Sequence, residues 1–139
     1  MIYISEYYQG VGLIWKNSLN ETAKIMALTN YFPELNHNET VGFWKINEMQ
    51  VSNNKLFVII LRDKEDHPRI LKQMKITKEL IEKEKVKVEF VDIKGETILE
   101  KIFSTIVLGF WTSYYLALLY KTDPTAIKMI EEFKRKLAK

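Results

Sequence analysis

A chain of 139 residues, 47% of them hydrophobic and 28% charged, can bury one core and is too short to contain two full domains. It has no cysteine, which excludes a disulfide framework and a thiolate zinc site, and we expect a reducing, cytoplasmic compartment. Its net charge of +3 is spread over interleaved lysines and glutamates, so the composition does not indicate a nucleic-acid-binding protein.

Short β-branched runs alternate with helical patterns along the chain, which predicts an α/β fold with a short, mostly parallel sheet. We expect strands at Ile2–Ser5, Leu56–Leu61 and Val86–Asp92, and loops at Val51–Lys55 and Arg62–Pro68. Helices are expected at about Gly10–Thr29, Leu35–Phe43, Pro68–Glu84, Glu96–Tyr120 and Pro124–Leu137, the last one capped by Asp123. Because three strands make a small sheet, the sequence predicts a single domain over residues 1–139 that is partial or is completed by a partner.

The first predicted helix carries a polar stripe beside its apolar one. The members of this stripe recur at helical spacing and are Asn17, Asn20, Glu21 and Lys24. Two amides beside an acid and a base could bind a polar ligand, whereas the simpler interpretation is a solvated face with a Glu21–Lys24 pair. The glycines at Gly10–Gly12 before this helix could cradle a phosphate, but a lone GxG favours a flexible turn.

A single histidine follows the first helical pattern. Pro33 interrupts the chain, and His37 then lies in the first turn of a short helix, beside Asn38. A lone histidine is more often a structural hydrogen-bonding group than a catalyst, so residue type alone favours the structural role. The other histidine, His67, lies in a charged loop and is expected at the surface.

An uncharged run of eighteen residues, Ile102–Leu119, lies within the fourth predicted helix. It reaches the lower limit of a membrane-spanning length. Its hydrophobicity is diluted by small and hydroxyl residues, namely Thr105, Gly109, Thr112 and Ser113. We therefore favour a central helix that is buried on most sides, and we expect no membrane partner.

The last predicted helix places a lysine within an apolar stripe. The stripe consists of Ile127, Ile130, Phe133 and Leu137, and its spacing predicts that it is buried. Lys134 falls within the same arc, where an amine is unfavourable unless it is paired or lines a cleft. The alternative is that the stem of Lys134 packs on the stripe while its amine reaches water.

Three segments of the sequence form a specific combination. They read IWKNSLNETAK, FPELNHNET and LGFWTSYYLALLYKTDPTAIKMIEEFK. They resemble the C-terminal half of the bifunctional phosphoglucose/phosphomannose isomerases of the sugar isomerase (SIS) superfamily, whose pattern is RWKNQFNENAK, PELNHNE and GDW.SYYLALL followed by DPTP. The resemblance covers essentially the whole chain, is looser in its middle, and implies a three-layer SIS-like (flavodoxin-like) fold.

The resemblance implies an aldose–ketose isomerase that interconverts glucose-6-phosphate or mannose-6-phosphate with fructose-6-phosphate. It gives Glu21 as the base that moves a proton between C1 and C2 through a cis-enediolate. It gives His37 to ring opening, often from across a dimer interface, and Lys134 to a sugar ring or hydroxyl oxygen. The candidate substrate-binding residues are Asn17, Asn20 and Asn38. We expect no metal and no organic cofactor, because this chemistry needs neither.

The sequence also departs from the family pattern. The substituted positions are Ile14, Ser18, Thr22, Phe110 and Ala126, none of which is a proposed catalytic group. The family has an N-terminal SIS domain with a Ser/Thr/Gly-rich phosphate-binding loop, which this chain, with five glycines, does not contain. We therefore expect a half-site that becomes active with an N-terminal SIS domain, as a homodimer, or both. The alternative is a non-catalytic sugar-phosphate-binding or assembly module of the same fold.

Overall fold

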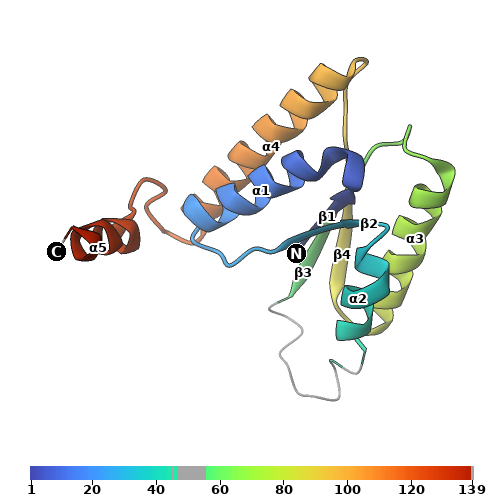
Figure 1. Ribbon diagram of the computed structural model, residues 1–139, viewed down its shortest axis with the longest axis horizontal. Coiled ribbons are helices and arrows are strands. Elements are labelled where there is room, and N and C mark those ends of the chain that lie inside the picture. The colour runs from blue at the N-terminus through green and yellow to red at the C-terminus, as the bar shows by residue number, and fades with distance from the viewer. Residues whose placement is uncertain (45, 47–55, 139) are drawn as a thin grey trace.

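A parallel β-sheet lies at the centre of the domain (Figure 1). The computed structural model describes residues 1–44, 46 and 56–138, and the predicted loop at Val51–Lys55 lies outside them. In the described residues the sheet has four strands, β1 (Ile2–Ser5), β2 (Thr29–Phe32), β3 (Phe57–Arg62) and β4 (Lys87–Asp92), in the order β2-β1-β3-β4. Every neighbouring pair of these strands is parallel.

Helices cover both faces of the sheet, which gives three layers (Figure 1). The described helices are η1 (Glu6–Tyr8), α1 (Gln9–Glu21), α2 (Leu35–Gly42), α3 (Pro68–Lys83), α4 (Ile98–Leu119) and α5 (Lys128–Leu137). Helices α1 and α4 pack together on one face, and α2 and α3 pack together on the other. Successive residues of β1 point to opposite faces, so Ile2 and Ile4 share a core cluster with Trp15, whereas Tyr3 shares one with Met74. The predicted three-layer α/β fold is confirmed.

Strand β2 is absent from the sequence prediction, which continued the first helix to Thr29. The helix ends at Glu21 instead, and Lys24 has a positive φ of 57°, which turns the chain away from the helix. The next residues return along β1, with Ile2 opposite Thr29 and Ser5 opposite Phe32. The predicted glycine turn is also wrong, because Gly10–Gly12 lie inside α1 and do not precede it.

Helix α4 approaches α1 closely because its inner face is made of short side chains. Its buried residues lie at every fourth position and are Lys101, Thr105, Gly109, Ser113 and Ala117. The indole nitrogen of Trp15 on α1 donates a hydrogen bond of 2.7 Å to the Thr105 carbonyl. A Cβ atom on Gly109 would lie 2.7 Å from the same indole nitrogen, so only glycine allows this approach.

The outer face of α4 carries its large apolar side chains, which are exposed in this chain. Trp111 is 54% exposed and Tyr115 is 58% exposed. The expectation that this helix is buried on most sides is therefore wrong, because one sheet and one neighbouring helix cover only one of its faces. By length and composition alone α4 could cross a membrane, and it is the one such helix in the described part of the chain. That property also belongs to helices of soluble domains, and here α4 forms part of an α/β layer.

Helix α5 differs from its prediction in extent and in environment. It begins at Lys128 and not at Pro124. The Asp123 side chain accepts hydrogen bonds of 2.8 Å from the Thr125 N–H and hydroxyl, so it closes a turn before the helix and does not cap it. None of the residues of α5 is buried, and the helix lies apart from the body of the domain (Figure 1). The predicted buried stripe of this helix is thus exposed in the single chain.

Candidate functional site

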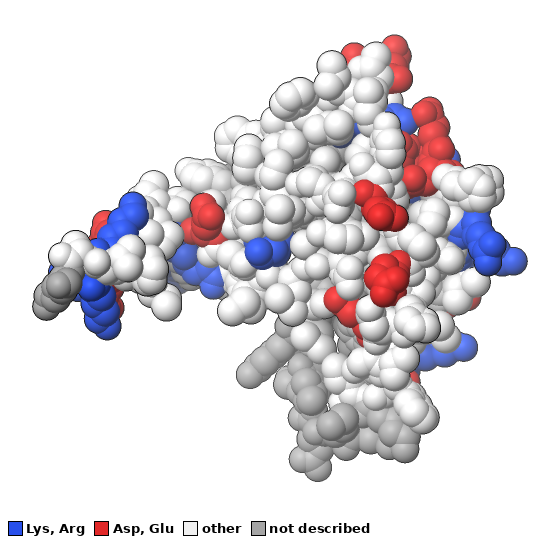
Figure 2. All heavy atoms as spheres, in the orientation of Figure 1, with Lys and Arg blue, Asp and Glu red and all other residues white. Residues whose placement is uncertain are grey.

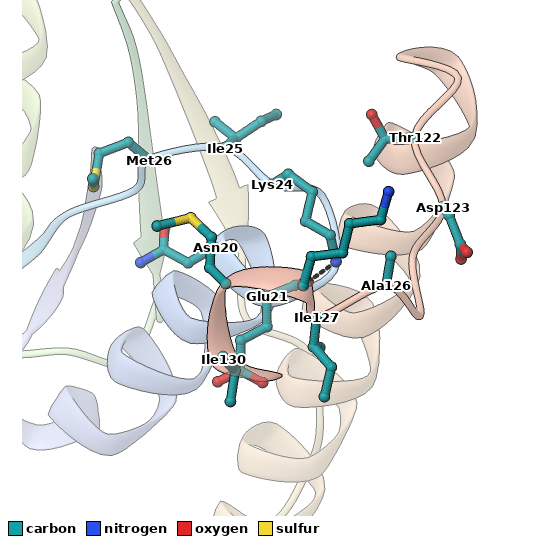
Figure 3. A pocket seen from close by; sticks show the side chains of 12 residues that line it. Asn20, Glu21, Lys24, Ile25, Met26, Thr122, Asp123, Ala126, Ile127 and Ile130 are labelled. Atoms are coloured by element: carbon teal, nitrogen blue, oxygen red, sulfur yellow. Dashed lines mark hydrogen bonds between the residues drawn. The ribbon is translucent and has the colours of Figure 1, made fainter. Parts of the chain in front are cut away.

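A cavity lies between the end of α1 and the start of α5 (Figure 3). Its volume is about 720 Å³. The walls are mainly apolar, and the polar side chains among them come from Asn20, Glu21, Lys24, Thr122, Asp123 and Lys128. Glu21 is exposed at the last position of α1, and its carboxylate has no hydrogen bond or ion pair with another described residue. A free carboxylate at the edge of an apolar cavity can accept a proton from a bound molecule.

Lys24 joins the two sides of this cavity. Its amine donates one hydrogen bond to the Glu21 carbonyl and another, of 3.3 Å, to the Pro124 carbonyl. The predicted Glu21–Lys24 pair on a solvated helix face is wrong, because α1 ends before Lys24 and the amine binds the backbone of Glu21. In Figure 3 the Glu21 side chain and the Lys24 amine leave the end of α1 in different directions.

Two of the predicted substrate-binding asparagines lie on α1, in different environments. Asn20 lines the cavity, but its amide is already bonded to the chain reversal after the helix. Its side-chain oxygen accepts a hydrogen bond of 2.6 Å from the Ala27 N–H, and its nitrogen donates one of 3.5 Å to the Ala27 carbonyl. Asn17 is exposed and is not among the residues that line the cavity.

His37 and Asn38 lie on α2, in the layer opposite to α1 (Figure 1). The His37 side chain is exposed. Asn38 donates to the Glu34 carboxylate at 3.2 Å and accepts from the Glu39 N–H at 2.7 Å. Neither residue lines the cavity that contains Glu21, so a single chain does not bring the predicted base and the predicted ring-opening histidine together.

Lys134 lies in the last turn of α5 and is exposed. It does not line the cavity, which the first turn of α5 closes instead. Of the six predicted site residues, the structure therefore places Glu21 and Asn20 at one cavity, with Lys24 as an additional cation. The roles of all six residues stay predictions, and those of His37, Lys134 and Asn38 depend on a partner.

The sequence analysis missed a second group of charged residues, which lies at the carboxyl end of β1 and β3. The amine of Lys101 on α4 lies 3.0 Å from the Asp63 carboxylate and 2.5 Å from that of Glu65. The Tyr8 hydroxyl donates to Asp63 at 2.6 Å, and the Ser5 hydroxyl donates to Asp66 at 3.1 Å. All of these residues except Ser5 border a cavity of about 420 Å³, and Lys101 and Asp63 are almost fully buried.

The two aspartates of this group have opposite pKa shifts. Burial alone would raise the pKa of the Asp63 carboxyl, but hydrogen bonds from Tyr8, Glu65 and Lys101 together hold it below its usual value. Burial raises the pKa of Asp66, and the neighbouring Asp63 charge adds to this, against the Ser5 hydrogen bond. Hydrogen bonds to Glu65 and Asp63 raise the pKa of Lys101, so this amine stays charged.

The sequence indicates this charged group through the places of its residues next to predicted elements. Lys101 directly precedes the uncharged run of α4, and the acidic residues directly follow β3, where parallel strands end together. His67, which was expected at the surface, is exposed and accepts a hydrogen bond of 3.2 Å from the Arg69 N–H at the start of α3. In the described residues, no group of three or more acidic or histidine side chains could hold a metal ion.

Known proteins of one kind are similar to this chain. A family model described as bacterial phospho-glucose isomerase C-terminal SIS domain matches residues 1–137. The chain is 42% identical over 125 residues to a bifunctional phosphoglucose/phosphomannose isomerase of Caldicellulosiruptor bescii, which is 89% of this chain and 36% of that protein. It is 30% identical over 138 residues to the protein of that name from Thermoplasma volcanium, which is 99% of this chain and 42% of the relative. The chain thus spans about two fifths of these relatives' length, and the predicted SIS fold is confirmed.

Proposed function

The chain belongs to the bacterial phospho-glucose isomerase C-terminal SIS domain family, and from this premise we propose that it supplies the proton-transfer half of a sugar-phosphate isomerase. The reaction is the interconversion of glucose-6-phosphate or mannose-6-phosphate with fructose-6-phosphate through a cis-enediolate. The observation that carries this proposal is the position of Glu21. Its carboxylate is unpaired within the described residues and borders a cavity of about 720 Å³, large enough for a sugar phosphate.

Glu21 acts as the base that removes a proton from C2 of the aldose and returns it to C1. An aldose–ketose isomerisation needs one carboxylate that reaches both carbons on the same face of the enediolate. The lining of the cavity supports this role, because apolar walls limit the access of water to the reacting carbons. Asn20 and Asn17 bind sugar hydroxyl groups from the same helix.

His37, Lys134 and Asn38 act in a site that more than one domain completes. His37 lies in the layer opposite to Glu21, so it serves the site of a second copy more readily than that of its own chain. Lys134 is exposed on a helix that lies apart from the domain, where a second domain or a second copy can place it over a substrate. The chain therefore works as a homodimer, with an N-terminal SIS domain, or with both.

The substrate phosphate needs an anchor from that additional domain. The cavity next to Glu21 has two amines, those of Lys24 and Lys128, and Lys24 is already bonded to backbone carbonyls. The relatives are more than twice as long as this chain, which is consistent with a further domain that holds the phosphate. We place the completed enzyme in the cytoplasm, in the sugar-phosphate steps of glycolysis and gluconeogenesis, with residues 1–139 as its C-terminal SIS unit.

The second candidate function is a sugar-phosphate-binding or assembly module without catalysis. The hydrogen bonds of Asn20 and Lys24 favour it, since both polar groups stabilise the chain reversal beside the cavity. The two candidates differ in the Glu21 carboxylate, which only the isomerase needs.

The experiment measures proton exchange at C1 of fructose-6-phosphate in heavy water, with the chain alone and with an N-terminal SIS domain of a close relative. We expect exchange in the completed assembly, and a decrease of about 10²- to 10⁴-fold in Glu21→Gln, whose amide accepts no proton from carbon. Glu79→Gln on α3 is the matched control, because Glu79 is exposed and distant in sequence from the cavity residues. Unchanged exchange in Glu21→Gln would remove Glu21 from the mechanism. Binding of fructose-6-phosphate without exchange in any assembly would favour the module.

A further inference from the structure

Helix α2 carries His37 on the side that faces away from the domain. The helix has eight residues, too few for a stable isolated helix, so its neighbours decide how it lies. Leu35 is fully buried, and Asn36 and Glu39 are bonded to neighbouring elements, so these three side chains define the inner arc of α2. At about 100° per residue, His37 lies roughly 150° from the middle of that arc. The imidazole is exposed and has no hydrogen bond with another described residue, so its direction depends on the rotation of α2 about its axis.

Asn36, the residue before His37, is bound to the neighbouring helix α3. Its side-chain oxygen accepts a hydrogen bond of 2.6 Å from the Thr77 hydroxyl. Thr77 is 2% exposed and lies between the buried Met74 and Ile81, so its hydroxyl interrupts an apolar helix face. A threonine hydroxyl inside a helix commonly bonds the carbonyl four residues earlier, but this one donates across the helix pair. The bond fixes α2 against α3 at one register, which non-directional apolar packing alone does not do.

Glu39 provides a second bond, which reaches the sheet. One oxygen of its carboxylate accepts a hydrogen bond of 2.8 Å from the side-chain amide of Asn30 on β2. The Asn30 side chain is itself held, because its oxygen accepts a hydrogen bond of 2.8 Å from the Tyr31 N–H. Asn36 and Glu39 are three residues apart and so lie on one side of α2, yet they bind two different elements. Two bonds to two elements fix both the rotation and the tilt of the helix.

The outer side of α2 suits one end of a sugar phosphate. Between Pro33 and Trp44 the chain has no lysine or arginine, and acidic side chains lie at the surface beside α2 (Figure 2). A phosphate is repelled by such a surface, because the charges have the same sign. The part of the substrate that meets His37 is therefore its uncharged sugar ring.

We propose that Asn36 and Glu39 are positioning residues that aim the His37 imidazole at the ring of the bound sugar. They do so by holding α2 at one rotation, through their bonds to Thr77 and Asn30. The inference rests on the proposed function, in which His37 opens that ring. In this step the anomeric hydroxyl loses its proton, the bond between the anomeric carbon and the ring oxygen breaks, a carbonyl forms, and the ring oxygen gains a proton. A group that serves both oxygens needs hydrogen-bond reach to each, and a displacement of about 1 Å can cost on the order of 100-fold in rate.

The experiment removes the Thr77 hydroxyl and measures two reactions of the full chain completed by an N-terminal SIS domain. The first is interconversion of the α and β anomers of fructose-6-phosphate, followed by NMR magnetisation exchange, which needs ring opening and no proton from carbon. The second is proton exchange at C1 of 5-deoxyfructose-6-phosphate in heavy water. This analogue lacks the hydroxyl that closes the ring, so His37 has no ring to open.

We expect Thr77→Val to slow the first reaction on the order of 10-fold and to leave the second nearly unchanged, because only the first depends on the aim of His37. Thr77→Ser keeps the hydroxyl and should keep the natural rate of both. The matched control is Thr105→Val on α4. Thr105 is 3% exposed and its hydroxyl donates a hydrogen bond of 2.6 Å to the Lys101 carbonyl, so this variant loses an equally buried hydroxyl and should change neither reaction.

Variants of α2 itself test the same bonds if Thr77→Val does not fold, which urea unfolding of each variant establishes. Asn36→Leu removes the acceptor of the Thr77 hydroxyl, whereas Asn36→Asp keeps one. Glu39→Leu removes the acceptor of the Asn30 amide, whereas Glu39→Gln keeps one. We expect both leucine variants to slow anomer interconversion selectively, and the other two to retain it.

The outcomes separate this inference from the function on which it rests. Absence of both reactions in the natural assembly would overturn the proposed function and the inference with it. Exchange at C1 without anomer interconversion in the natural assembly, equal slowing of the two reactions in Thr77→Val, slowing of neither, or a Thr77→Ser variant as slow as Thr77→Val would overturn the inference and leave the isomerase intact.

Discussion

Ionisable groups lie at both ends of α1, but they are buried and hydrogen-bonded at one end and exposed at the other. Before its start, Tyr8 and Asp63 are buried, and the Asp63 carboxylate accepts hydrogen bonds from the Tyr8 hydroxyl and from the Lys101 amine. At its end, Glu21 is exposed and has a carboxylate without a partner in the described part of the chain. The first group holds η1, β3 and α4 together, and the second leaves a charge available to a bound molecule.

This difference shows that the hydrogen-bond partners of a charged residue indicate a ligand site better than its position on an α/β sheet does. The carboxyl ends of parallel strands are the usual place for a ligand, and Asp63 lies there. Yet its hydrogen-bonding capacity is used by Tyr8, Lys101 and the Glu65 N–H. The cavity at the other end of α1 is the one with an unpaired carboxylate, that of Glu21.

Removal of the Lys101 amine should have the largest effect on stability, because it acts on the buried, hydrogen-bonded end of α1. Lys101→Met leaves the Asp63 carboxylate buried without its cation, so we expect the melting temperature at pH 7 to fall by on the order of 10 °C. In the natural chain the lowered pKa of Asp63 means that this carboxylate contributes stability at neutral pH, which is lost as the pH falls below about 4.

The measurement is thermal unfolding of Lys101→Met and of Lys72→Met as a function of pH. Lys72 is an exposed lysine on α3 and should be replaceable with little change. If the buried pair is responsible, the loss in Lys101→Met is largest at neutral pH and shrinks towards pH 3. Equal stability of both variants at pH 7 would mean that the first end of α1 is not held by its charges.

The elements with strong local patterns could be predicted from the sequence. Strand β1 has the predicted bounds, β3 is displaced by one residue, and β4 begins one residue later than predicted. The apolar runs of β1 and β3 suit strands covered on both faces, whereas β4 alternates charged and apolar residues. Strand β2 could not be found in this way. Its four residues are partly polar, and the helix before it ends through side-chain contacts of Asn20 and the backbone of Lys24, which leave no periodic signal.

The candidate site was predictable only in part, for a related reason. The resemblance identified Glu21, and the structure places it at a cavity. It does not bring His37 or Lys134 there, because one lies across the sheet and the other on an exposed helix. Their predicted roles depend on surfaces outside this chain. Lys24 was recognised as part of the polar stripe, but its bonds to two carbonyls follow from the turn after α1, which was predicted as helix.

Two asparagines on α1 test the structure at the end of the helix that carries Glu21, with a smaller expected change in stability. Asn20→Ala removes both hydrogen bonds to Ala27 and leaves a buried N–H without this acceptor, so we expect a loss of about 1–2 kcal/mol in unfolding free energy. Asn17→Ala should cost less than about 0.5 kcal/mol, since Asn17 is exposed. Urea unfolding gives both values, and hydrogen exchange of the Ala27 amide should accelerate only in Asn20→Ala. Equal losses in the two variants would contradict the structural role of Asn20.

The smallest expected effect has the opposite sign and comes from the partner of Ser5. Burial raises the pKa of Asp66 above its usual value, so its charged form is disfavoured in the folded chain and lowers stability at neutral pH. One of its carboxylate oxygens is buried and has no hydrogen-bond partner in the described residues.

Asp66→Asn keeps an acceptor for the Ser5 hydroxyl and removes the charge next to Asp63. We therefore expect Asp66→Asn to be more stable than the natural chain at pH 7, by at most about 1 kcal/mol because solvent partly screens this side chain. The gain should shrink as the pH falls through the raised pKa and disappear by about pH 3, below the ordinary pKa of an aspartate, where Asp66 is mostly protonated in both the folded and the unfolded chain. Asp63→Asn in the same series should lose stability at pH 7. Urea unfolding at both pH values therefore distinguishes two aspartates of one cluster by the sign of their effects, and a destabilised Asp66→Asn at pH 7 would show that the Asp66 charge is needed by the Lys101 amine.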